Sequence, residues 1–169
     1  MRRNHHEICP DGSGTCKISF PFPNFAPSIL IAFHRMVYRR FYSEVGKLLY
    51  AIAAVDGTVQ KKEYDKLRDI VEKKLVPEEH STDQFGTDSA YYAEIEFDIL
   101  LDQSADSTSC FNSFCNYVDA HRTAFDVHLK SMVMNLANEL AHVYHGINSK
   151  EAAMIKKLKK KLDEIFQAK

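Results

Sequence analysis

The chain has 169 residues, 45% of them hydrophobic, and a formal net charge of -1 at pH 7. This length and apolar content predict one domain with a sizeable core, and a charge near zero argues against a nucleic-acid partner or attraction to an anionic membrane. No apolar run is long enough for a membrane span and no secretory signal is recognisable. We therefore expect a cytoplasmic, reduced protein.

The first 35 residues differ from the rest of the chain. Prolines and glycines interrupt this segment and no helical period is sustained, so we expect an irregular, loosely packed arm over residues 1–35 and a folded domain over residues 36–169. Cysteines and histidines in the arm match no closed zinc spacing. A second interpretation is that translation begins at Met36, so that the arm is not native protein.

Two helices are predicted at the start of the domain. Apolar residues recur three and four positions apart over residues 37–55, and Gly57 is suited to the positive φ that stops a helix. A second helix is predicted over residues 60–75, with Glu63 at the third position of a capping box. Pro77 is expected to end it.

The turn between these helices also matches the second half of an EF-hand calcium loop, through Asp56, Gly57 and Glu63. The first and third positions of that loop are then Ile52 and Ala54, which offer no oxygen ligand. The sequence therefore favours a helix–turn–helix corner over a calcium-loaded EF-hand.

Residues 78–89 are mostly polar and are interpreted as a linker, after which further helices are predicted. One spans residues 90–101 and carries Ile95 among the residues of its apolar surface. After a short connection, Ser107 is suited to cap the next helix, in which aromatic residues follow helical spacing.

The end of the chain repeats the plan of residues 37–75. A long helix over residues 125–144 is expected to end at Gly146, and residues 148–151 form the capping box of a last helix that continues to Phe166. The sequence therefore predicts an all-α, compact helical domain of about six or seven helices, with two similar helix–turn–helix pairs.

Two stretches resemble the TerB-like family, named for tellurite resistance proteins and also found as a module in some membrane-linked J-domain co-chaperones. They are LYAIAAVDGTVQKKE at residues 49–63 and NELAHVYHGINSKE at residues 138–151, and the resemblance covers about residues 37–166. It implies a compact all-helical bacterial domain of the cytoplasm, associated with stress resistance and with suspected binding of divalent metal through acidic residues. It implies no known reaction.

The second corner departs from the family pattern. Tyr144-His145-Gly146 stands where an acidic residue before glycine is usual. This departure argues against a metal site that takes acids from both corners.

A candidate metal site is suggested by Glu139, His142 and His145, which recur every three residues and share one helix face. Together with Asp56 and Glu63 they form our candidate ligand set for a divalent metal ion. A di-iron centre would need a second Glu-x-x-His motif, which the sequence lacks. The alternative is that these are polar residues on the outer face of an amphipathic helix.

No phosphate-binding glycine loop, nucleophile elbow or catalytic triad motif is recognisable, and the lysine run at residues 156–161 is interpreted as a solvated helix face. Our leading hypothesis is a non-enzymatic domain of the tellurite-resistance and stress-response type that binds a protein partner and a divalent metal, and a homo-oligomer is compatible with it. The alternatives are a metal-dependent enzyme centred on Glu139, His142 and His145, or a purely structural adaptor.

Overall fold

The computed structural model describes residues 27–78, 82, 86–142 and 148–167, with side chains from Tyr38 to Ile165 within those ranges, apart from Glu78. The described residues are mostly helical and contain no strand, which confirms the all-α class. In chain order the elements are α1 (Pro27–Ala53), α2 (Lys61–Ile70), the π-helical turn η1 (Val71–Leu75), α3 (Val76–Glu78), the 3-10 turn η2 (Ser89–Tyr91), α4 (Tyr92–Asp102), α5 (Ser107–Ala120), α6 (Val127–Ala141) and α7 (Ser149–Gln167).

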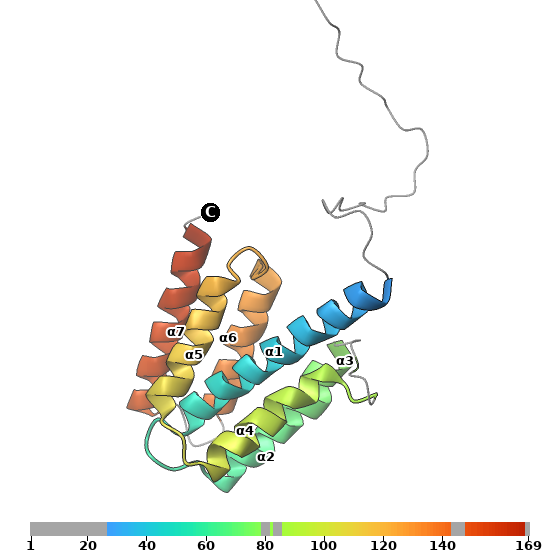
Figure 1. Cartoon of the computed structure of the whole chain (residues 1–169). Helices are drawn as coiled ribbons and strands as arrows, with labels where there is room; N and C mark the ends of the chain where they lie inside the picture. Colours follow the sequence, from blue (N-terminus) through green and yellow to red (C-terminus); the bar gives the residue numbers. More distant parts are fainter. Residues whose placement is uncertain (1–26, 79–81, 83–85, 143–147, 168–169) are drawn as a thin grey trace, which may run out of the picture.

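The long helix α1 runs through the middle of the bundle (Figure 1). It packs against α4, α5, α6 and α7, with α2 and α4 along one flank and α5, α6 and α7 on the other. Val45, Leu48, Leu49 and Ile52 are at most 1% exposed, as their helical spacing predicts. The core therefore lies around the second half of α1.

The start of α1 differs from the prediction, because the helix begins at Pro27 rather than at residue 37. Proline is tolerated in the first turn of a helix, where its missing N–H would have no intrahelical partner. The arm expected over residues 1–35 lies outside the described residues as far as residue 26, and it stays a prediction there.

At Gly46, α1 approaches the backbone of α4 closely. A Cβ atom at this position would lie 2.4 Å from the carbonyl oxygen of Ala93 and 3.0 Å from Cβ of Glu96. The first contact is closer than a methyl group permits and the second is tight, so the distance between α1 and α4 depends on this glycine.

The second helix continues beyond its predicted end. α2, η1 and α3 follow one another without a break, and helical backbone reaches Glu78, one residue past Pro77. Pro77 therefore lies inside the described helix, although its missing N–H leaves one hydrogen bond of the helical ladder unmade. The π-helical turn η1 in the middle was not predicted, and such turns are rare.

The buried face of α4 also differs from the prediction. Ala93, Phe97 and Leu100 are buried, whereas Ile95 and Ile99 are 44% and 45% exposed. Ile95 is two positions from both Ala93 and Phe97, which places it about 200° away from each around a helix of 3.6 residues per turn. The prediction that Ile95 belongs to the packed face is therefore wrong.

Aspartates cap the next two helices. The side chain of Asp106 accepts a hydrogen bond from the N–H of Ser109 at 2.7 Å, so Asp106 and not Ser107 is the N-cap of α5. Asp126 caps α6 in the same way, through the N–H of Leu129 at 2.8 Å. The α6 helix ends at Ala141, and the stop expected at Gly146 lies outside the described residues.

Candidate functional site

Both corners expected from the sequence carry a capping glutamate. At the first, Oε2 of Glu63 accepts a hydrogen bond from the N–H of Gln60 at 2.7 Å. At the second, Oε2 of Glu151 accepts from the N–H of Asn148 at 3.0 Å, and Oδ1 of Asn148 accepts from the N–H of Glu151 at 2.9 Å. Both predicted capping interactions are confirmed, and both fix a carboxylate at a helix start.

The two corners meet in space. Nδ2 of Asn148 donates a hydrogen bond to Oδ2 of Asp56 at 3.4 Å, and another to Oε1 of Glu151 at 2.7 Å. Burial raises the pKa of Glu63, and the negative charges of Glu151 and Asp56 raise it further, against the opposing effect of the hydrogen bond from Gln60. We call Asp56, Glu63, Glu151 and Asn148 the corner junction.

Among the described residues, the carboxylates of the corner junction have no cationic partner. Glu63 and Glu151 are 6% and 5% exposed. None of the three acids forms an ion pair with a lysine or arginine in the described ranges. Because buried like charges are costly without compensation, this junction favours either a proton or a bound cation.

Another predicted metal ligand, Glu139, is engaged by two lysines. Glu139 on α6 is paired with Lys66 at 2.7 Å and with Lys74. Burial raises the pKa of Glu139, but hydrogen bonds and charges from the two lysines outweigh it and hold the pKa below its usual value. The structure thus uses this carboxylate to join α6 to α2 and η1.

The histidines predicted beside Glu139 do not complete a site in the described structure. His142 is exposed at the end of α6, and its Nδ1 donates to the carbonyl oxygen of Asn138 at 2.5 Å. His145 lies outside the described residues. Across the part of the chain that is described, no group of three His, Cys, Asp or Glu side chains is arranged to hold a metal ion.

Sequence reasoning missed Glu151 as a candidate ligand. The signal was present, because the repeated plan of the two corners places Glu151 in the same position as Glu63. The capping box accounts for Glu151 without a second role, whereas in the structure the charge of Glu151 also raises the pKa of Glu63.

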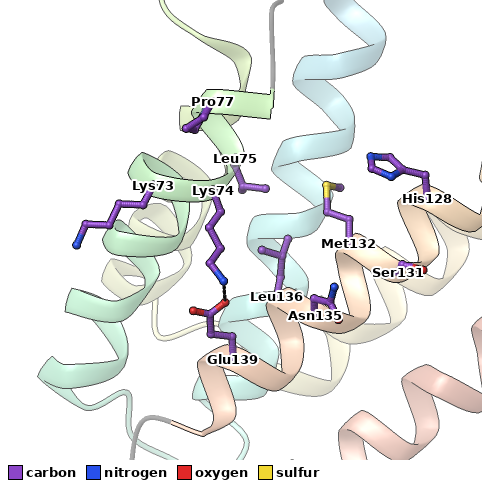
Figure 2. Close-up of a pocket in the computed structure, with 10 residues that line it drawn as sticks. All are labelled: Lys73, Lys74, Leu75, Pro77, His128, Ser131, Met132, Asn135, Leu136 and Glu139. Atoms are coloured by element: carbon purple, nitrogen blue, oxygen red, sulfur yellow. Dashed lines mark hydrogen bonds and ion pairs between the residues drawn. The ribbon is translucent and has the colours of Figure 1, made fainter.

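A pocket of about 420 Å³ lies between α6 and the continuous helix formed by α2, η1 and α3 (Figure 2). Leu75, Met132 and Leu136 supply apolar surface, and His128, Ser131 and Asn135 follow one another along α6. The Lys74–Glu139 ion pair crosses one end of the pocket. No sequence motif pointed to this pocket, because it depends on how two helices pack.

Within the described residues, no helix combines the length and the hydropathy that crossing a bilayer requires. Comparisons with protein-family models, with curated proteins and with solved structures give no match.

Proposed function

We propose that this chain is a non-enzymatic helical binding domain of the TerB-like kind, with two paired helix–turn–helix units, that serves a bacterial stress response such as tellurite resistance. In this proposal it acts through a protein partner, and the corner junction holds a divalent cation. The observation that supports the cation is the gathering of Asp56, Glu63 and Glu151 without an ion-paired base.

The donor chemistry of the junction fits a hard cation. Carboxylate oxygens are the ligands that Mg²⁺ and Ca²⁺ prefer, and Oε1 of Glu63 accepts no hydrogen bond from the described residues. Mg²⁺ is commonly held by one or two carboxylates and completes its coordination with water, so it does not need three converging side chains. Asp56 and Glu63 would hold the ion, which would offset the repulsion among the acids.

The cation is tested on the full chain by elemental analysis and then by calorimetric titration with Mg²⁺, Ca²⁺ and Zn²⁺. We expect saturable binding of Mg²⁺ or Ca²⁺ that Asp56→Asn and Glu63→Gln each weaken by about tenfold or more. Glu139→Gln and His142→Ala are the matched controls, because they alter the competing site predicted on α6. If binding survives Asp56→Asn and Glu63→Gln but is lost in Glu139→Gln and His142→Ala, the site lies on α6.

The absence of binding for every ion would remove the cation from the proposal and leave the protein partner to be tested separately. The feature that supports such a partner is the exposed pair Ile95 and Ile99, one turn apart on the outer face of α4. An Ile95→Asp, Ile99→Asp double variant should retain the thermal stability of the wild type. It should lose association, measured by light scattering for copies of the chain and by site-specific photo-crosslinking for a different partner.

A further inference from the structure

The pocket between α6 and η1 joins an apolar floor to a polar rim (Figure 2). Leu75 and Leu136 are 1% and 3% exposed, and Met132 lies partly buried against the core. Because the two leucines are already buried, the apolar surface that a short hydrocarbon body could remove from water on this floor belongs to Met132.

Three polar side chains on the α6 wall have no partner among the described residues. His128, Ser131 and Asn135 are separated by three and four residues, so they lie along one face of the helix. Each is exposed, and none makes a hydrogen bond or ion pair within the described part of the chain. They are therefore free to donate hydrogen bonds to a molecule in the pocket.

The charges at the end of the pocket leave one cation in excess. The single carboxylate of Glu139 is shared by the ammonium groups of Lys66 and Lys74. If Lys74 turns toward another anion, Lys66 still neutralises Glu139, so the exchange leaves no charge unpaired. Lys74 can therefore serve an incoming anionic group at little cost.

From these observations we infer that the pocket is a binding site for a small amphiphile, in which one anionic group contacts Lys74 and the polar side chains of α6. The hydrocarbon body lies against Met132. A carboxylate and a phosphate share the required chemistry. The site has no residue in common with the corner junction, so the inference does not depend on the cation proposed there.

The neighbouring lysine provides a matched control. Lys73 is adjacent to Lys74 in the same π-helical turn, but its side chain points away from α6 (Figure 2) and its ammonium group pairs with Asp69 at 2.7 Å. Lys73→Gln and Lys74→Gln thus make the same chemical change one residue apart. Both residues line the pocket, but only Lys74→Gln removes an ammonium group that is turned toward α6.

The test titrates the full chain with octanoate, octyl phosphate, octanol and inorganic phosphate, followed by calorimetry and by amide NMR shifts. We expect saturable binding of octanoate or octyl phosphate, with shifts at Ser131 and Asn135, and binding of octanol and inorganic phosphate weaker by about tenfold or more. The preference between octanoate and octyl phosphate identifies the head group.

Lys74→Gln should weaken binding of the preferred amphiphile by about tenfold, whereas Lys73→Gln should leave it unchanged. Met132→Trp, which fills the pocket from its floor, should abolish binding and provides a second readout if Lys74→Gln disturbs the fold. The inference is overturned if neither amphiphile binds saturably, if the shifts lie elsewhere, or if both lysine variants have the same effect.

Discussion

Replacing Gly46 with alanine tests the close approach between α1 and α4. The new methyl carbon would lie 2.4 Å from the carbonyl oxygen of Ala93, whereas carbon–oxygen contacts are ordinarily about 3.3–3.6 Å. The two helices must therefore separate by nearly 1 Å, because a backbone oxygen cannot rotate away. Overpacking of this kind costs about 1–3 kcal/mol, and a gap of that size also weakens the neighbouring dispersion contacts.

Helix propensity acts in the opposite direction, since alanine in a helix interior is favoured over glycine by about 1 kcal/mol. We expect the packing cost at Gly46 to win, with a net loss of up to about 2 kcal/mol and a fall in Tm of up to roughly 4–8 °C for a domain of this size. The measurement is urea unfolding followed by far-UV circular dichroism, together with calorimetry. A Gly46→Ala protein more stable than the wild type would refute the reasoning, because propensity alone would then decide.

Three further outcomes follow from the corners. The pKa of Glu63 is raised, so at pH values just above the ordinary pKa of 4.5 the native state binds more protons than the unfolded state. The free energy of unfolding should therefore fall as the pH rises from 4.5 to the raised pKa. Glu63→Gln should make this fall smaller, measured as urea midpoints at a series of pH values. Asn148→Ala removes the N-cap of α7 and should lower stability by about 1 kcal/mol, measured by calorimetry, whereas an unchanged Tm would contradict the capping role. The new Cβ of Gly57→Ala would lie in open space, but the backbone φ at this position is +112°. We therefore expect backbone strain alone to lower the free energy of unfolding by about 1–3 kcal/mol, measured by urea unfolding. Unchanged stability would mean that the turn relaxes.

Much of the fold follows from local patterns in the sequence. Each helix carries apolar residues at three- and four-residue spacing, and a polar or glycine-containing segment precedes the next. The first corner illustrates this, since Gly57 and the capping glutamate Glu63 lie where the pattern places them. The errors concern boundaries and faces. Pro27 was interpreted as a breaker although it begins α1, and Ile95 was assigned to the core on hydrophobicity alone.

The candidate site was harder to predict, because it depends on how helices rotate against one another. Spacing along α6 shows that Glu139 and His142 are near neighbours, but it cannot show that Lys66 and Lys74 of another helix reach Glu139. Nor can it show that Glu151 lies near Glu63. The pocket also depends on η1, and we know of no sequence signature for a π-helical turn.

The position of α1 also bears on how the protein is made. Among the described elements α1 is synthesised first, whereas its packing partners α5, α6 and α7 are synthesised after α2 and α4. The part of α1 that packs against these three helices is therefore exposed to solvent or chaperones until they emerge. Contacts between distant parts of a chain slow folding through the entropy of loop closure. We therefore expect the core around α1 to be completed only after α7 has been synthesised.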